Sequence, residues 1–467
     1  MTVQTEQVAL TNWSKSASST CFVYKVNDVA GIHAALAAAR AQGLSVIPHG
    51  AGHSYTDAAL NTGGVVMDLT PMHRILSWDA QHGVMCVEPG VTLQKMIQVA
   101  AQAGWWPVVS PSTPQVTVGG CVAMNVNGRN AWKCGPFGAA VLSLDVLLPS
   151  GELRTLSPAQ DSQLFHAFVG SLGLLGITTS ITVQLQHMVS GHVSVRKRSA
   201  AALDGIFAIF AEEENNSDFM EAWLDGFARG SQLGRGHVTS AALSPSAERR
   251  PSAFSTHNRI ERLEGSIVTL LAGLSRPALF PGVHMANRLN YWWGRRPRAQ
   301  QSHLRGLVPY TFWPSAAFSG YHAMFPQGVE TFQAFVPLPA APFIFKEVLR
   351  YSQKHDSIPL WCIIKRHRRD QFLLSYQLDG FSLELNYART PQTAQHLQQV
   401  LQHMIATVIE AGGKFYLAKD HYLTAPQYRQ SIGEQSLKTF LQLKRQFDPE
   451  NRLQSDLYRR LFQPALL

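Results

Sequence analysis

A short run of small and hydrogen-bonding residues, VIPHGAGHSYTDAAL at residues 46–60, is the stretch of this chain best suited to hold a charged ligand. Glycine lets the backbone approach a ligand closely and adopt positive φ angles, so that successive N–H groups form a nest for an anion. The stretch has neither the GxGxxG spacing of a dinucleotide-binding turn nor the GK[ST] of a P-loop. From the pattern alone, a phosphate-binding loop and an ordinary turn between two strands both remain open.

Two further glycine-rich passages change that balance. One is SPSTPQVTVGGCVAMNVNGRNAWKCGPFG at residues 110–138, and the other is GLLGI at residues 173–177. A large cofactor with two phosphates needs several backbone cradles of this kind. Three such loops within one part of the chain therefore favour phosphate binding.

The elements around these loops alternate between strand and helix. FVYKV and LSVIP are typical of strands, and AGIHAALAAARAQG between them is typical of a helix that ends at Gly43. This predicts a β-α-β opening with the first glycine loop at the carboxyl end of a strand, where α/β folds place ligands.

The pattern changes at about residue 195. Long strand-like runs follow (DFMEAWLDGF, VETFQAFVPL, PLWCIIKRH and FSLELNYA), with two helices, APFIFKEVLRYSQK and PQTAQHLQQVLQHMIATVIEAG. A basic, proline-broken region separates them at residues 248–305, and the last part of the chain returns to helix. We expect an α+β protein of two domains: residues 1–195, residues 196–412, and a segment at 413–467 that completes the first domain.

The composition of the chain limits the kinds of partner that it can be expected to bind. The 467 residues carry a formal net charge of +9 and a pI near 9.4, which favours an anionic partner such as a phosphate-bearing substrate or an acidic lipid surface. Nucleic acid is not expected, because no helix-turn-helix, zinc-finger or RNP-type signature accompanies the charge. Five cysteines without a CxxC pair argue against a disulfide scaffold. With no long apolar run and no secretory signal, we expect a cytoplasmic protein.

Three motifs now show a resemblance. PxGxGHSYxDxA, TVGG followed by NVNGRN, and GLLGI resemble the FAD-binding domain of the vanillyl-alcohol-oxidase (PCMH) type. Near the C-terminus, YLAKD, LKRQFDP and SDLYRRL are similar to the decaprenylphosphoryl-β-D-ribose 2′-oxidase subfamily, the flavin enzymes of a ribose-to-arabinose epimerisation. The resemblance implies an antiparallel-sheet substrate domain flanked by helices, beside the FAD domain. It also implies oxidation of a secondary alcohol of a sugar, with hydride transfer to flavin N5.

The resemblance assigns roles to particular residues. The FAD-binding positions are His49, Gly50, Ala51, Gly52, His53, Ser54, Tyr55, Thr56, Asp57, Ala58, Ser112, Thr117, Val118, Gly119, Gly120, Met124, Asn125, Val126, Asn127, Ile177 and Tyr416. Lys419, Tyr55 and Asn127 are the implied catalytic residues, Lys419 by stabilising the negative charge of reduced flavin. Gln333, Lys365, Glu384 and Lys419 are implied to face the substrate. From the pattern alone Gln333 and Lys365 would be ordinary strand residues. No metal ion is expected.

Three positions depart from the subfamily. His53 replaces an arginine, and related aldonolactone and alditol oxidases link a histidine at this position covalently to the flavin. Asn127 replaces a histidine beside the flavin, and an asparagine cannot act as a base. Glu384 replaces a cysteine at the substrate face, where a carboxylate would repel a phosphate unless it is paired. These three departures affect the prediction of which substrate is bound, but they do not affect the prediction of FAD as the cofactor.

The partners follow from these alternatives. If the substrate is a lipid-linked sugar on a polyprenyl phosphate, a short-chain reductase partner would act on the oxidised product. The protein would then contact the inner face of the plasma membrane peripherally. The basic, aromatic YWWGRRPRAQ at residues 291–300 suits such contact, although it could equally pack under a loop. The alternative is a soluble carbohydrate, alditol or aldonolactone oxidase with covalent FAD on His53. A double-bond reductase and a non-catalytic flavin- or lipid-binding module remain as further readings.

Overall fold

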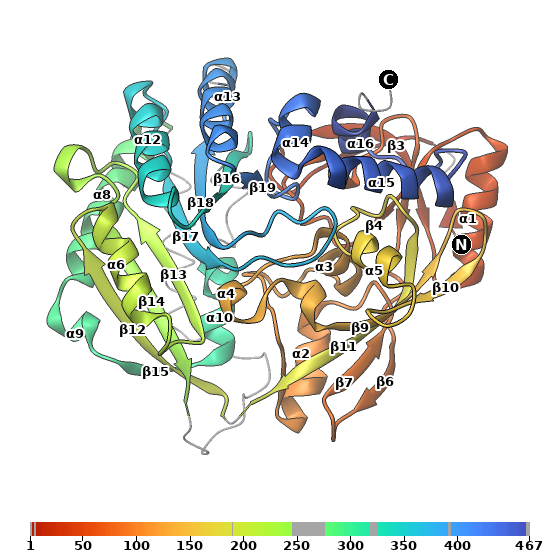
Figure 1. The fold of residues 1–467 in the computed structure, drawn as a ribbon, viewed down its shortest axis with the longest axis horizontal. Helices are drawn as coiled ribbons and strands as arrows, with labels where there is room; N and C mark the ends of the chain where they lie inside the picture. Colours follow the sequence, from red (N-terminus) through yellow and green to blue (C-terminus); the bar gives the residue numbers. More distant parts are fainter. Residues whose placement is uncertain are drawn as a thin grey trace.

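Three β-sheets organise the chain (Figure 1). The computed structural model describes residues 2–3, 6–188, 190–244, 276–317, 325–390 and 394–463. Two sheets, of five and six strands, lie in the N-terminal part, and an eight-stranded sheet lies in the middle of the chain. The predicted α+β architecture with an antiparallel sheet flanked by helices is confirmed.

The first sheet contains the predicted β-α-β opening. Strand β3 (Ser18–Lys25) and strand β4 (Val46–His49) both run parallel to β5 (Val65–Asp68), and helix α1 (Val29–Ala41) connects them. Helix α1 begins where the Asp28 side chain accepts a hydrogen bond from Gly31 N at 2.7 Å. Strands β1 (Thr2–Val3) and β2 (Val8–Thr11) add antiparallel edges to β3. The first glycine loop leaves the carboxyl end of β4, as predicted.

The second sheet is antiparallel, and its long central strand is β11 (Ile177–His187). Its other strands are β6 (Ile75–Asp79), β7 (Val84–Val87), β8 (Trp105–Pro107), β9 (Val141–Leu147) and β10 (Leu153–Leu156). Four short helices connect these strands: α2 (Leu93–Ala100), α3 (Val118–Met124), α4 (Ala131–Cys134) and α5 (Ser162–Phe168).

The third sheet has the order β15-β12-β14-β13-β17-β18-β16-β19, with all neighbours antiparallel. Its strands are β12 (His192–Ala200), β13 (Phe219–Leu224), β14 (Gly236–Leu243), β15 (His303–Gly306), β16 (Val329–Pro337), β17 (Trp361–His367), β18 (Gly380–Ala388) and β19 (Lys414–Phe415).

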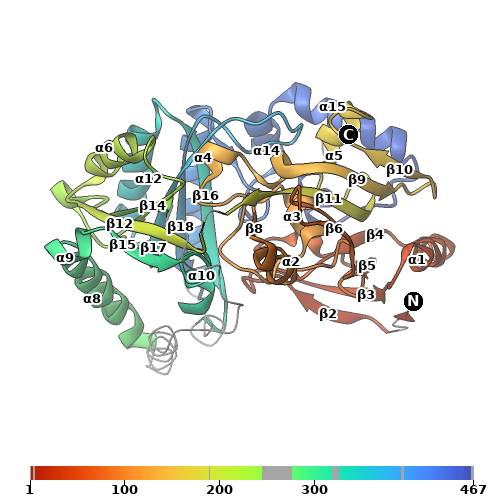
Figure 2. The ribbon, with the colours of Figure 1, turned by 90° about the horizontal axis from the view of Figure 1, so that it is seen from below.

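Helices cover both faces of this sheet. Figure 2 shows α6 (Leu203–Glu213) and α12 (Ala341–Lys354) on one side, and α8 (Arg276–Gly294), α9 (Pro297–Gln300) and α10 (Leu307–Ala317) on the other. Helix α13 (Ala394–Glu410) packs against α12 and β16.

The structure corrects two predictions about residues 195–410. Residues 195–410 hold more helices than the two predicted, because α6, α8, α9 and α10 are also helical. Helix α6 places Leu203, Ile206 and Phe210 at helical spacing against the sheet. The basic region at residues 248–305 is not broken at every proline, since α8 continues through Pro281. The part of that region at 248–275 lies outside the described residues.

The C-terminal segment returns to the first sheet. It carries α14 (Ala425–Ile432), α15 (Glu434–Phe447) and α16 (Asp456–Leu461). Val46 N donates to Arg452 O at 2.8 Å, and Gln454 N donates to Val46 O at 3.0 Å, so the segment extends the sheet beside β4. The LKRQFDP motif has a structural role, because Lys444 forms a buried ion pair with Asp448 beneath this junction.

Candidate active site

The three glycine-rich passages meet in space. A Cβ on Gly50 would lie 2.2 Å from Thr117 Oγ1, and a Cβ on Gly173 would lie 2.5 Å from the Pro48 side chain. Leu172, directly before the third passage, donates its N–H to the carbonyl of Ala123 in α3 at 3.0 Å. The first loop therefore touches the second, and the third touches both of the others.

Buried polar atoms without partners lie where the passages meet. Asn125 adopts a left-handed conformation (φ 45°) at the end of α3, and its Oδ1 accepts from Gly138 N at 2.9 Å. Within the described residues, its Nδ2 has no hydrogen-bond partner, and neither has the Oγ of the buried Ser171. An unpaired buried polar group is costly. These unpaired atoms beside three glycine-rich passages fit a polar group such as FAD, which would supply their hydrogen-bond partners.

The C-terminal segment joins the first glycine loop directly. Tyr55 N donates to Ala418 O at 2.8 Å, and Thr56 Oγ1 donates to Leu417 O at 2.7 Å. Arg460 donates to both carboxylate oxygens of Asp57, at 3.0 and 2.7 Å. These bonds hold Lys419 over the Tyr55 ring, with Nζ 3.8 Å from the ring centroid.

Lys419 forms an ion pair with Glu384 on β18. Its Nζ lies 3.2 Å from Glu384 Oε1, and both side chains are largely buried, at 21% and 12% exposure. Burial alone would raise the pKa of Glu384, but Lys419 and Lys365 lower it below its ordinary value. Burial alone would lower the pKa of Lys419, but Glu384 and Tyr55 raise it. Both groups are therefore charged at neutral pH.

Strand register brings the predicted substrate residues to one face of the third sheet. Gln333 on β16 and Ile363 on β17 both pair with Glu384 on β18, and Lys365 lies two residues beyond Ile363. Side chains two apart on a strand, or directly paired across strands, point to the same side of a sheet. Gln333 is 2% exposed, and its Oε1 has no partner among the described residues.

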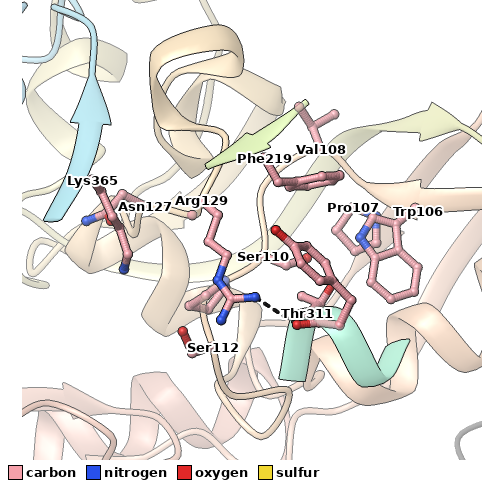
Figure 3. A pocket seen from close by; sticks show the side chains of 13 residues that line it. Trp106, Pro107, Val108, Ser110, Ser112, Asn127, Arg129, Phe219, Thr311 and Lys365 are labelled. Carbon is pink, nitrogen blue, oxygen red and sulfur yellow. Dashed lines mark hydrogen bonds between the residues drawn. The ribbon is translucent and has the colours of Figure 1, made fainter. Parts of the chain in front are cut away.

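A pocket lies beside this face (Figure 3). Lys365 and Asn127 lie together on one side of it, Trp106 lies on the far side, and Arg129 lies between them. Glu221 on β13 balances the two cations, with Arg129 Nη2 at 3.2 Å and Lys365 Nζ at 3.8 Å. One carboxylate thus faces two cations, which leaves the pocket positively charged.

The pocket also offers free hydrogen-bonding atoms. Among the described residues, Arg129 Nε, Ser110 Oγ and Thr311 Oγ1 are buried without a partner. Arg129 Nη1 donates to Tyr310 O at 2.7 Å, which fixes the guanidinium in place. The arrangement suits a ligand that carries hydroxyl groups and a negative charge.

We call the surface where the three glycine-rich passages meet the FAD cradle. Asn127 connects this cradle with the pocket. Its Nδ2 donates to Tyr376 OH at 3.2 Å, and that hydroxyl donates to Asn125 O at 2.6 Å. The Tyr376 ring also packs on Tyr416, with centroids 4.2 Å apart. Asn127 therefore lines the pocket and is joined through Tyr376 to the end of α3.

The remaining predicted FAD-binding residues lie in the first glycine loop, in the second glycine-rich passage and in the core. His49 is close to the cradle, where burial lowers its pKa against the opposing effect of Asp68. The His53 ring packs 4.4 Å from that of Trp13, and Ile177 is buried in the core behind the first sheet. In the second passage Ser112 lines the pocket, whereas Val118, Gly119, Gly120, Met124 and Val126 lie in or directly after α3. The structure does not bring Ile177 together with the pocket residues.

Several residues of the site escaped the sequence analysis. Arg129 stands two positions after Asn127 in NVNGRN, so its charge beside a predicted site residue was a usable signal. Glu221, Tyr310 and Tyr376 gave no such signal, because strand register and the packing of α10 and a loop bring them to the site. Arg460 lies in the SDLYRRL motif, but its bond to Asp57 was not predicted.

Comparison with known proteins defines the class. Residues 21–157 match the family model of the FAD binding domain, and this range holds the first two glycine-rich passages. The chain is therefore an FAD-dependent oxidoreductase. Within the described residues, no cluster of histidine, cysteine and carboxylate side chains could hold a metal ion.

Individual relatives narrow the class. The chain is 28% identical over 462 residues to the decaprenylphosphoryl-β-D-ribose oxidase of Mycolicibacterium smegmatis, covering 97% of both chains. It is 34% identical over 148 residues to the D-lactate dehydrogenase of Anaerostipes hadrus, covering 30% of this chain and 31% of that one. It is also 27% identical over 190 residues to the mitochondrial L-galactono-1,4-lactone dehydrogenase 1 of Oryza sativa, covering 40% and 32%. The resemblance to a PCMH-type FAD domain is confirmed.

Proposed function

We propose that the chain oxidises a secondary hydroxyl group of a sugar carried on a polyprenyl phosphate, as the first step of a ribose-to-arabinose epimerisation. The observation that carries the proposal is the Lys419–Glu384 pair beside a positively charged pocket. The similarity along nearly the whole chain to an oxidase of decaprenylphosphoryl-ribose supports the same substrate class. A short-chain reductase would then return the ketone to an alcohol of the opposite configuration.

The chain's own residues bind and orient the sugar. The ionised Glu384 accepts a hydrogen bond from the reacting hydroxyl and takes its proton as the carbonyl forms, while the free Gln333 Oε1 accepts from a neighbouring hydroxyl. Lys419 remains an ammonium ion and holds the carboxylate in place. FAD, when bound, supplies the hydride acceptor.

The pocket beside the pair accounts for the phosphate. Lys365 and Arg129 present two cations to one carboxylate, so a phosphate would complete the charge balance there. Glu384 does not repel that phosphate, because Lys419 already neutralises it. The departure from cysteine at this position is therefore compatible with a phosphate-bearing substrate.

A second candidate is a carbohydrate or lactone oxidase with FAD linked covalently to His53. The match over 190 residues to an L-galactono-1,4-lactone dehydrogenase favours it. Acid precipitation of the purified protein separates the two candidates. Yellow colour kept in the pellet, and released in a His53→Ala variant, supports the covalent flavin, whereas colour in the supernatant supports the prenyl-linked sugar.

Anaerobic bleaching of the flavin by substrate, without nicotinamide, tests the proposed reaction. We expect Lys419→Ala to slow bleaching at least about 100-fold, the usual effect of removing one electrostatic donor from a reacting centre. Lys438→Ala, on the exposed side of α15, is the matched control and should bleach like the wild type. Equal rates for Lys419→Ala and wild type would refute the assigned mechanism. A flavin reduced by NADPH but never by an alcohol would indicate a double-bond reductase.

A further inference from the structure

Helix α8 carries apolar side chains on two opposite faces. Its inner face packs on the sheet domain: Tyr291 is 4% exposed, and Asn287 Nδ2 donates to Leu360 O at 3.0 Å. At about 100° per residue, the opposite face holds four large apolar side chains. They are Met285, Leu289, Trp292 and Trp293, between 43% and 58% exposed. A helix on the surface of a soluble protein normally has a polar outer face.

Arginines surround this apolar outer face. Residues 276–305 contain six arginines and no aspartate or glutamate. Arg288, Arg295, Arg296 and Arg298 are exposed, and the Arg295 guanidinium lies 5.2 Å from the Trp292 ring centroid. Leu304 on the edge strand β15 adds a further exposed apolar side chain, at 61%. We call these nine residues the tryptophan–arginine face.

The tryptophan–arginine face lies on the outside of the molecule and leads to the pocket. Figures 1 and 2 place α8 and α9 at the end of the molecule away from α1. The chain runs from α9 through β15 into α10, whose residues Tyr310 and Thr311 line the pocket. A partner surface bound to the tryptophan–arginine face would therefore lie on the same side of the third sheet as α10, which lines the pocket.

We propose that the tryptophan–arginine face docks on a lipid bilayer that contains anionic phospholipid. Tryptophan side chains favour the headgroup level of a bilayer, and arginines beside them bind lipid phosphates. The absence of carboxylates in this segment and the apolar side chains favour such a surface over a protein partner of mixed charge. Among the described residues no helix has the length and hydropathy to span a bilayer, so the contact is peripheral. The inference rests on the proposed function only in explaining the docking: a polyprenyl-linked sugar lies in a bilayer.

Co-sedimentation of the holoprotein with vesicles tests the docking. The vesicles are phosphatidylcholine, with or without a share of phosphatidylglycerol. We expect binding only with the anionic lipid, and weaker binding at high salt. Replacing Arg295, Arg296 and Arg298 by glutamate should weaken it at least 100-fold, because each arginine near such a surface contributes about fivefold. Trp292→Ala/Trp293→Ala should weaken it at least tenfold.

Matched controls come from α12 in the same domain. Phe343→Ala removes an aromatic ring that is 65% exposed, and Arg350→Glu reverses an arginine that is 61% exposed. Both should bind vesicles like the wild type, and flavin retention verifies that every variant is folded. Unchanged binding in both α8 variants, or a dimer that dissociates on Trp292→Ala/Trp293→Ala in the absence of lipid, overturns the proposal. If vesicles are not bound but a detergent-dispersed prenyl-linked sugar still bleaches the flavin, only the docking fails and the proposed function stands.

Discussion

Replacing Glu384 by glutamine should move the pH profile of the reaction. The charges of Glu384 and Lys419 are 3.2 Å apart, which corresponds to about 5 kcal/mol of attraction at an effective dielectric constant of about 20. This attraction raises the pKa of Lys419 against the cost of its burial. In Glu384→Gln only Tyr55 still opposes the burial cost, so the pKa of Lys419 should fall.

The assay is the rate of anaerobic flavin reduction as a function of pH. Glu384→Gln also removes the proton acceptor, so the rate should fall by about 10²- to 10⁴-fold. The alkaline limb of the residual rate, where Lys419 loses its proton, should shift to lower pH. Lys419→Arg should lose this limb altogether, because a guanidinium stays protonated throughout the range. Glu212→Gln removes a carboxylate that is 60% exposed and serves as the control with an unchanged profile. An alkaline limb that stays in place in Glu384→Gln would refute the assigned coupling.

Two further predictions concern the FAD cradle and its neighbourhood. Gly50→Ala places a Cβ 2.2 Å from Thr117 Oγ1, so the purified variant should retain at least tenfold less flavin, whereas Gly282→Ala, with open space around it, should retain as much as wild type. Equal flavin content in the two variants would show that the close approach is not needed. Burial raises the pKa of Asp420 to about 6, with Arg460 opposing, so the folded state binds a proton more tightly than the unfolded state and loses stability as the pH rises from about 4 to 6. Asp420→Asn should remove up to about 3 kcal/mol of that dependence, and thermal midpoints that change in parallel for variant and wild type would contradict it.

Local patterns predicted the first glycine loop and its place at the end of a strand, but not the pocket. The glycines of the first loop and the β-α-β opening could be read from the sequence, because strand, helix and loop residues there are contiguous. Gln333, Lys365 and Glu384 came from the resemblance, and the register of β16, β17 and β18 gives the physical reason why they share a face. Tyr310 and Tyr376 contact the site through α10 and a loop that no periodicity connects to it. Their positions depend on tertiary packing, which overrides local patterns.

Helix α8 illustrates the other kind of failure. Pro281 and the arginine-rich stretch at residues 291–300 suggested an irregular region, yet α8 is helical to Gly294. Pro281 lies inside α8, where a proline removes a backbone hydrogen bond and can bend the helix, but the residues on both sides of it remain helical. The buried stripe of Asn287, Tyr291 and Gly294 was hidden by the equally apolar outer face.

The most direct test of the central claim is anaerobic addition of a polyprenyl-phosphate ribose to the purified holoprotein while the visible flavin absorbance is recorded. The account predicts that the absorbance bleaches with wild type and with Lys438→Ala, and at least about 100-fold more slowly with Lys419→Ala. With Lys365→Ala, which removes one cation from the pocket, it bleaches only at higher substrate concentration. A flavin that the prenyl-linked sugar leaves oxidised, while a free sugar or lactone bleaches it, would contradict the account and favour the His53-linked oxidase.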